Sequence, residues 1–246
     1  MPAGRVYSRV MKTGLLLGML VGGSLACLAA DLAQPVEPVA TWIDPDDPSV
    51  AAIRQTGESL IDRVGYMMIY EVERTVADKG LAKAIEVVHL KDLSLPKPQP
   101  GQPRVTAIRR TSLHLRNPAN HPDSPDRAAL SVIDSALRGG NDVPAVLVQK
   151  VENPGAPAEW RVYRPITTMP LCVKCHGPVE DLAADVRTQL ALKYPNDRAT
   201  GYTAFQWRGL IRISMTAPEP AVAPPAKQAG PAGGLAPVNQ PAKLRP

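Results

Sequence analysis

Two cysteines and a histidine form the most reactive segment of the chain, Cys172-Val173-Lys174-Cys175-His176. Two thiols separated by two residues lie about one helical turn apart, so both can form thioethers with the vinyl groups of one haem. The adjoining imidazole then lies under the iron as an axial ligand. The segment therefore predicts one covalently bound haem c, attached through Cys172 and Cys175, with His176 as the proximal ligand.

Two other interpretations of this cysteine pair compete with haem attachment. A zinc knuckle would need a fourth ligand, and a thioredoxin-like pair would be expected at the start of a helix in a βαβ context, which the sequence does not offer. The third cysteine, Cys27, lies in an apolar N-terminal run. Pro170 before the motif and Gly177-Pro178 after it confine the predicted attachment turn between chain breakers.

The N-terminal segment has the composition of a secretory signal. Basic residues come first, and they are Arg5, Arg9 and Lys12. The apolar run 14–26 is too short for a comfortable membrane span and is followed by small residues. We predict that residues 1–30 are a signal peptide and that the protein is periplasmic. An uncleaved anchor or lipidation of Cys27 are the alternatives, and either would keep the protein at a membrane.

Composition and charge set the limits of the folded part. Removal of the signal leaves 25 Lys and Arg against 23 Asp and Glu, a balance of +2 that does not suggest nucleic acid as a partner. Residues 217–246 are rich in Pro, Ala and Gly and are expected to form a disordered tail. We therefore expect a linker at 31–48 and one domain at 49–216.

Helical periodicity is present in four segments of that domain. A long helix is predicted from the cap at 47–49 to Gly80, and a shorter one follows and ends before the proline-rich stretch 96–103. Ser124-Pro125 begins a third helix that Gly139-Gly140 ends. The fourth is expected at 181–194.

Strand-like patterns occur mostly later in the chain. Residues 105–115 are mostly extended, and the runs 145–151 and 160–166 are predicted to form a hairpin through 153–155. The run 209–215 alternates, with Ile211, Ile213 and Met215 on one face. Because strands and helices do not alternate regularly, we expect an α+β fold with an antiparallel sheet.

The sixth position of the iron would decide between electron exchange and ligand binding. His89 borders the apolar stripe of the second helix, where it is either a core residue or the distal iron ligand. Met67 and Met68 on the long helix compete for this role, whereas Met169 is tied to the proximal side by its nearness to Cys172. The remaining histidines are expected to be exposed, and these are His114 and His121.

Several arginine and aromatic side chains could belong either to a haem site or to the rest of the fold. Arg110 and Arg116 either hydrogen-bond the haem propionates, for which a planar guanidinium is suited, or lie on a solvated strand face. Tyr163, Arg164 and Trp207 either line the haem pocket or belong to the core.

The sequence also resembles the Tll-like single-haem family, a bacterial group known chiefly as a domain of unknown function. The similar strings, over about residues 49–216, are Arg109-Arg110-Thr111-Ser112, Arg116-Asn117-Pro118-Ala119-Asn120, Tyr163-Arg164-Pro165-Ile166, the cysteine motif, residues 194–202 and Trp207-Arg208-Gly209. The resemblance implies a PAS-like fold, with a five-stranded antiparallel sheet flanked by helices, and a c-type haem for electron transfer or redox sensing. In the structurally known type a cysteine supplies the second axial ligand. The corresponding stretch 84–89 has none, and the resemblance makes His89 the substitute.

The residues together predict an exported monohaem c-type cytochrome that transfers single electrons or senses redox state. A haem-based sensor of gases or small ligands, signalling through a separate protein, is the alternative. No nucleophile and base stand out as a pair, so we do not expect an enzyme. The expected partner is an unidentified redox or signalling protein.

Overall fold

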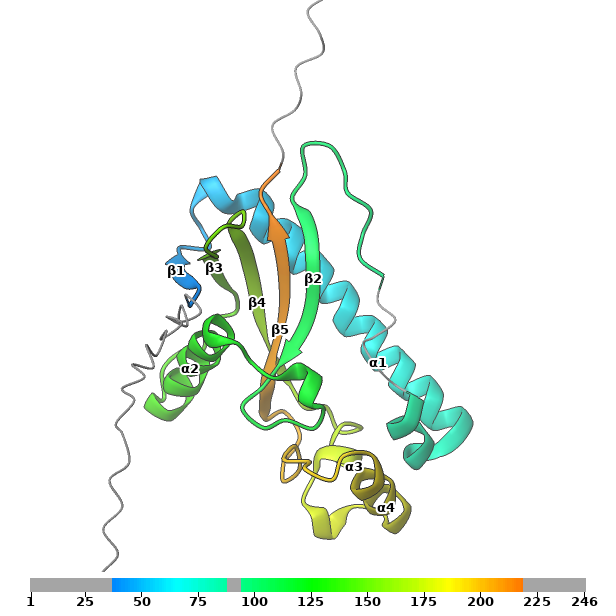
Figure 1. Cartoon of the computed structure of the whole chain (residues 1–246). Coiled ribbons are helices and arrows are strands. Elements are labelled where there is room, and N and C mark those ends of the chain that lie inside the picture. Colours follow the sequence, from blue (N-terminus) through cyan, green and yellow to red (C-terminus); the bar gives the residue numbers. More distant parts are fainter. Residues whose placement is uncertain (1–36, 88–93, 219–246) are drawn as a thin grey trace, which may run out of the picture. The chain divides into compact units, whose positions relative to one another are not determined.

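One antiparallel sheet organises residues 37–87 and 94–218, which are the residues that this computed structural model describes (Figure 1). The order across the sheet is β1-β3-β4-β5-β2. The five strands are β1 Val39–Ile43, β2 Arg104–Thr111, β3 Leu147–Glu152, β4 Glu159–Thr167 and β5 Trp207–Thr216. The predicted α+β class and five-stranded antiparallel sheet are confirmed.

Helices connect these strands. The α-helices are α1 Ala51–Val87, α2 Ser124–Gly139, α3 Val173–His176 and α4 Ala184–Lys193. Short 3-10 segments lie at Pro48–Val50, Pro118–Asn120 and Val179–Asp181. The helix predicted at 181–194 thus begins three residues later than expected. Within the described ranges, none of the helices combines the length and apolar character that a membrane span requires.

The predicted hairpin between β3 and β4 is confirmed. The two strands pair antiparallel, with Val148 opposite Val162, and the amide of Ala156 donates to the carbonyl of Asn153 in the connecting turn. The extended segment predicted at 105–115 is shorter than expected. It leaves the sheet after Thr111, where the hydroxyl of Ser112 accepts a hydrogen bond from the amide of His114 and bends the chain.

Strand β1 was not predicted and corrects the assignment of residues 31–48 to a linker. It pairs antiparallel with β3, with Thr41 opposite Lys150. Val39 and Trp42 remain largely exposed on this edge strand, so the segment lacks the alternating burial that marks a strand in a sequence. Backbone hydrogen bonds hold it in place. The predicted signal peptide, the N-terminal part of that linker and nearly all of the predicted tail lie outside the described residues.

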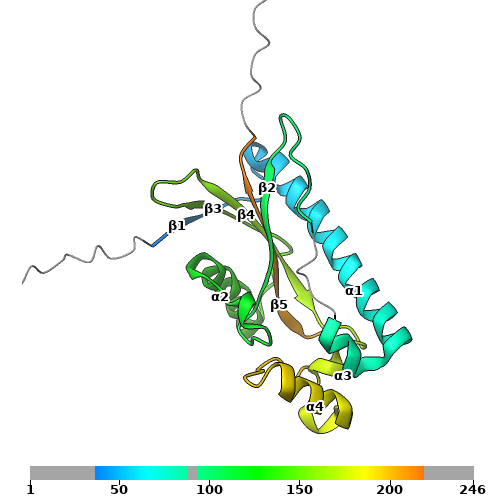
Figure 2. The ribbon, with the colours of Figure 1, turned by 45° about the vertical axis from the view of Figure 1, so that its right-hand side comes forward.

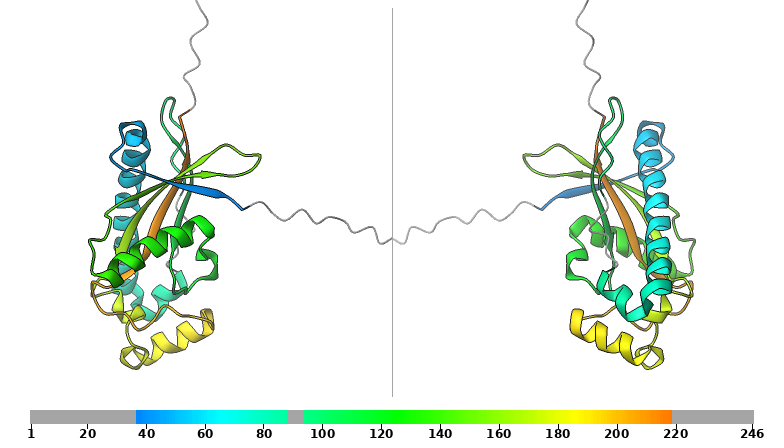
Figure 3. Two further views of the ribbon diagram at one scale, coloured as in Figure 1. Left: turned by 90° about the vertical axis from the view of Figure 1, so that its left-hand side faces the viewer. Right: turned by 90° about the vertical axis from the view of Figure 1, so that its right-hand side faces the viewer.

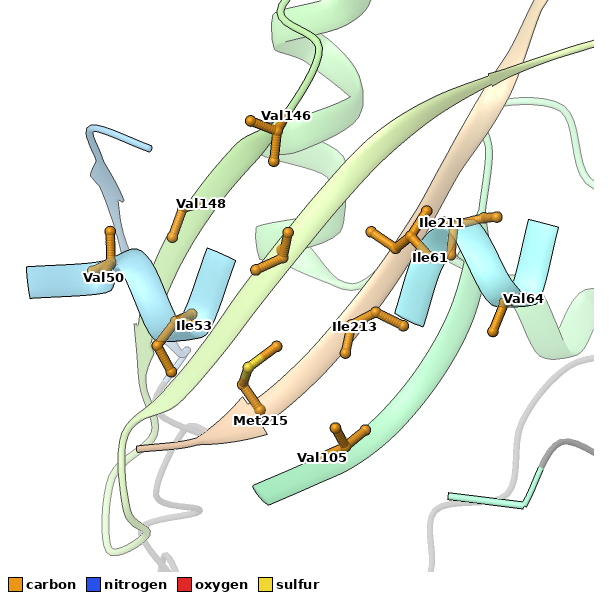
Figure 4. Close-up of a cluster of buried hydrophobic side chains, with 11 residues drawn as sticks. Val50, Ile53, Ile61, Val64, Val105, Val146, Val148, Ile211, Ile213 and Met215 are labelled. Carbon is orange, nitrogen blue, oxygen red and sulfur yellow. The ribbon is translucent and has the colours of Figure 1, made fainter. Parts of the chain in front are cut away.

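Helix α1 and helix α2 cover opposite faces of the sheet (Figures 2 and 3). Side chains of α1 and the preceding 3-10 turn meet those of four strands in the larger core, which contains Val50, Ile53, Ile61, Val64, Val105, Val146, Val148, Val162, Ile211, Ile213 and Met215. Figure 4 shows Ile211, Ile213 and Met215 along β5, on the face of the sheet that α1 covers. The predicted apolar face of that strand is therefore confirmed.

Gly80 interrupts α1, as predicted. Its backbone has a positive φ of 80°, which breaks the helical path within the element Ala51–Val87. The part before Gly80 packs on the sheet. The part after it packs on α4, where Ile85 contacts Leu182, Val186 and Leu190 in a separate apolar cluster.

Helix α2 begins and ends where the sequence predicts. Asp123 caps its N-terminus by accepting a hydrogen bond from the amide of Asp126, and Gly140 ends it in the left-handed conformation. Its apolar side packs on the sheet in a cluster of Ala129, Leu130, Ile133, Leu147, Tyr163 and Leu210.

Buried charges also fix α2 to the sheet, and the sequence analysis missed them. Arg212 donates to both carboxylate oxygens of Asp126, at 2.9 and 3.0 Å, and Arg161 donates to Asp123 at 2.8 Å. The hydroxyl of Tyr163 lies 3.2 Å from Asp126. Burial alone would raise the pKa of Asp123, but the hydrogen bonds from Arg161 and from the amide of Asp126, together with the charges of Arg161 and Arg212, outweigh it, and the net pKa is lowered. Ion pairs at the N-terminal end of α2 thus add to its apolar contacts with the sheet.

Replacing Gly57 with alanine is expected to destabilise the fold. A Cβ atom at this position of α1 would lie 2.5 Å from Cβ of Val162 in β4, so the helix and the sheet would have to separate. Overpacking of this kind costs about 1–3 kcal/mol. Chemical denaturation of Gly57→Ala and of the unaltered protein measures the loss.

Gly65 in the same helix provides the matched control, because a Cβ atom there meets nothing within 4 Å. Gly65→Ala is expected to stabilise the helix by about 0.5–1 kcal/mol. Equal unfolding midpoints for the two variants would contradict the close approach of α1 to β4.

Candidate functional site

The cysteine motif lies at one end of the sheet, in the connection between β4 and β5 (Figure 1). Cys172 caps α3, and its carbonyl accepts hydrogen bonds from the amides of Cys175, at 3.1 Å, and His176, at 2.9 Å. Both thiols are free. The predicted single turn of helix between the two thiols is therefore present.

The imidazole of His176 is fixed by one hydrogen bond. Its Nδ1 lies 2.7 Å from the carbonyl oxygen of Ala199. Because a carbonyl only accepts, Nδ1 carries the proton and Nε2 keeps its lone pair. Burial, followed by the positive charges of Arg116 and Arg208, lowers the pKa of His176 well below its usual value. The side chain is thus a neutral imidazole whose Nε2 can bind a metal.

A second segment, residues 197–206, runs beside the motif and holds it. We call it the strap. The amide of Tyr202 donates to the carbonyl of His176 at 2.9 Å, and the amide of Gly201 donates to Gly177 at 2.8 Å. At its far end, the amide of Thr168 donates to Gln206 at 2.9 Å. The strap thereby aligns the whole segment from the end of β4 to α3.

Sequence reasoning did not assign a positioning role to the strap. Part of it was quoted in the string 194–202 for the family resemblance, and that string is the signal that would have found it. Its contacts with the motif are backbone hydrogen bonds across more than twenty residues of sequence, which no local pattern encodes.

Arg116 joins the motif, the strap and the loop after β2. Its Nε lies 2.9 Å from Oδ2 of Asp197, and its Nη2 donates to the carbonyls of Cys175 and Ala199. Both side chains of the ion pair are largely buried. The predicted contact of Arg116 with a propionate stays a prediction. The structure gives this guanidinium protein partners and makes it a clamp on the cysteine turn.

Arg110 differs from Arg116 because it forms no hydrogen bond or ion pair within the described part of the chain. Burial, followed by the neighbouring positive charges of Arg208 and Arg116, lowers its pKa to about 10. Cys172 lies close enough to oppose this effect. Arg110 thus presents an unpaired cation near the cysteine turn.

Tyr202 packs between the two histidines of this end of the fold. Its ring centroid is 6.4 Å from that of His176 and 6.4 Å from that of His114, in edge-on arrangements. The predicted exposure of His114 and of His121 is confirmed. Neither lies in the core.

Tyr163, Arg164 and Trp207 do not contact the cysteine turn in any hydrogen bond or ion pair of the described residues. Tyr163 is buried in the cluster beneath α2, and Trp207 packs against the same cluster. Arg164 forms an ion pair with Asp62 of α1. The core interpretation, which the sequence left open, is thus correct for Tyr163 and Trp207, whereas Arg164 is partly exposed in its ion pair.

The methionines considered as second axial ligands differ in their exposure to solvent. Met67 is 38% exposed on α1, and Met68 packs against the core between α1 and the sheet. Met169 is 42% exposed beside the cysteine turn. His89 lies outside the described residues. No three side chains of His, Cys, Asp or Glu converge as a metal-binding group in residues 37–87 and 94–218.

Comparison with known proteins identifies the family. A family model described as "Tll0287-like: Tll0287" matches residues 90–216, a little over half of the chain. The chain belongs to the Tll0287-like family. The resemblance inferred from the sequence is therefore confirmed, and the matched range contains the whole motif and strap.

One solved structure is similar to this Tll0287-like chain, the crystal structure of the cyanobacterial heme-protein Tll0287. Sequence identity is 25%, the TM-score is 0.33, and the match covers 47% of this chain and 63% of that protein. No curated protein matches.

The buried ion pair in this site is expected to hold the fold as well as the motif. Asp197→Asn would leave Arg116 charged and unpaired in a largely buried place, which costs about 3–5 kcal/mol. Urea denaturation measures the change in the free energy of unfolding.

The pair Arg138–Asp134 on α2 is the matched control, since it has the same length of 2.9 Å but an exposed arginine. Asp134→Asn is expected to cost less than about 1 kcal/mol. Similar losses at the two aspartates would show that Arg116 does not depend on Asp197.

Proposed function

We propose that this chain is an exported monohaem c-type cytochrome with a PAS-like α+β fold, which acts in one-electron transfer or redox sensing. Cys172 and Cys175 would carry the haem as thioethers, and His176 would be the proximal iron ligand. The observation that carries the proposal is the free Nε2 of His176, fixed by Ala199, beside two free thiols within one helical turn.

Three properties of the residues present fit a haem c. The thiols have the spacing that two vinyl groups need, the neutral imidazole offers one nitrogen, and Arg110 provides an unpaired cation for a propionate. A zinc site would need further ligands, and the described residues offer no such cluster at the motif. Membership in a family with a heme protein supports the same cofactor.

The chain's own residues would prepare the iron ligand. Bound haem would supply a one-electron couple. The hydrogen bond from Nδ1 to Ala199 fixes the ring orientation and makes Nε2 a better donor. Arg116 holds the carbonyl of Cys175, so the turn that bears both thiols keeps its shape. We propose no enzymatic activity.

We propose His89 as the distal ligand. The part of α1 after Gly80 approaches the motif, because Ile85 and the thiol of Cys175 belong to one apolar cluster. Lys193 of α4 donates to the carbonyl of Ile85 at 2.7 Å and anchors this part of the helix. His89 follows Ile85 by four residues, a distance that the chain spans in about 14 Å or less.

The proposed setting follows from the predicted signal peptide. Export to the periplasm suits haem attachment, which takes place outside the cytoplasm. A separate redox or signalling protein would exchange electrons or information with the haem domain at 49–216.

Production of the exported protein with haem-attachment machinery is expected to give a reduced pyridine haemochrome spectrum of one haem c per chain. The haem should remain with the polypeptide in acidified organic solvent, since two thioethers hold it. Cys172→Ser with Cys175→Ser is expected to abolish this retention. A colourless wild-type protein, or complete extraction of its haem into the solvent, would refute the proposed covalent attachment.

His89→Ala is expected to change the haem spectrum from low spin toward high spin and to open the iron to carbon monoxide. His121→Ala is the control, because His121 is exposed. An unaltered low-spin spectrum would exclude His89 as the ligand. Rapid carbon monoxide binding by the wild-type protein would favour the gas-sensor alternative.

A further inference from the structure

Three arginines surround the cysteine turn, but only one carboxylate is paired with them. Arg116 forms an ion pair with Asp197, whereas Arg110 and Arg208 have no carboxylate within ion-pair distance in the described part of the chain. The positive charges of Arg116, Arg208 and Arg110 each lower the pKa of His176, so all three guanidiniums lie near its ring. Unpaired charges are strongly unfavourable away from water, and this end of the fold has two of them, on the buried Arg208 and the half-buried Arg110.

Arg208 is the more buried of the two, with only 8% of its surface exposed. Its Nη1 donates to the hydroxyl of Ser112, and its guanidinium lies over the ring of Tyr202, with its central carbon 5.2 Å from the ring centroid. Its buried Nε has no hydrogen-bond partner within the described residues. The protein therefore leaves the hydrogen-bonding capacity of this guanidinium incompletely satisfied and its charge without a carboxylate.

The chemistry of the missing partner follows from this arrangement. Two uncompensated guanidiniums next to the same turn call for two negative charges, and guanidinium donors match carboxylate oxygens in geometry. A haem carries two propionate carboxylates. Tyr202 connects the two features, because it packs under Arg208 on its face and against His176 at its edge.

We propose that Arg208 is a haem-binding residue and that, together with Arg110, it forms a cradle for the two propionates. This inference rests on the proposed function. Arg116 is a positioning residue, because its charge is already paired with Asp197. Arg110 and Arg208, which have no carboxylate partner in the described residues, would bind the propionates. Ser112 and Tyr202 orient Arg208 for this contact.

The test uses the haem-loaded full chain with Arg208→Gln, Arg208→Lys and Arg110→Gln, and it measures the midpoint potential by spectroelectrochemistry. Oxidised haem has one more positive charge than reduced haem, so a nearby cation favours the reduced form. Loss of the cation at either position is expected to lower the reduced-to-oxidised ratio about tenfold at a fixed potential, equal to about 59 mV for one electron. Arg208→Lys keeps the charge and should retain most of the potential.

Arg109→Gln is the matched control. Arg109 precedes Arg110 in β2, projects to the other face of the strand, and donates to the carbonyl of Ala119 at 2.9 Å. Its loss is expected to leave the potential unchanged. If Arg208→Gln matches Arg109→Gln in potential, or if Arg208→Lys shifts it as much as Arg208→Gln, the cradle is wrong.

Inorganic phosphate separates the propionates from a free anion as the source of negative charge. Propionates that occupy the cradle leave the wild-type potential insensitive to added phosphate. A saturable shift of the midpoint potential with phosphate in the wild type, absent in Arg208→Gln, would show that the arginines bind a free anion and not the propionates. That result would overturn the inference. Potentials are compared per haem, quantified as the pyridine haemochrome. A wild type without haem would instead refute the proposed function.

Discussion

The hydrogen bond between Nδ1 of His176 and the carbonyl of Ala199 is the constraint on which the candidate site depends. It decides which nitrogen of the imidazole keeps a lone pair, and it does so through a backbone atom that no side-chain substitution removes directly. The backbone hydrogen bonds of Gly201 and Tyr202, together with Arg116 and Asp197, hold the strap and its Ala199 next to the cysteine turn. The chemistry of one histidine therefore rests on a contact between two loops and a clamp from a third.

Local features of this fold could be predicted, because their causes lie within a few residues. The spacing of Cys172, Cys175 and His176 implies one helical turn, and Asp123 and Gly140 provide the caps of α2 at the predicted ends. The alternation of Ile211, Ile213 and Met215 reports a strand with one buried face. In each case the determining interaction is short in sequence.

Interactions between distant residues could not be predicted. Arg116 and Asp197 are 81 positions apart, and only the fold brings their charges together, so the sequence left Arg116 as a candidate for the propionates. The buried ion pairs of Asp126 with Arg161 and Arg212 look like ordinary surface charges in a sequence. Strand β1 is held by its backbone while two of its large side chains face solvent, and a pattern of side chains cannot report that.

The segment that carries the cysteine motif begins and ends at the same place on the sheet. Thr168 and Gln206 are hydrogen-bonded neighbours at the ends of β4 and β5, so the chain between them leaves the sheet and returns to the same place. The pairing of β4 with β5 therefore continues to the base of this excursion. The reactive segment is a long insertion between two neighbouring strands, and α1 and Arg116 tie it to the rest of the domain, so its sequence and that of its supports have to change together.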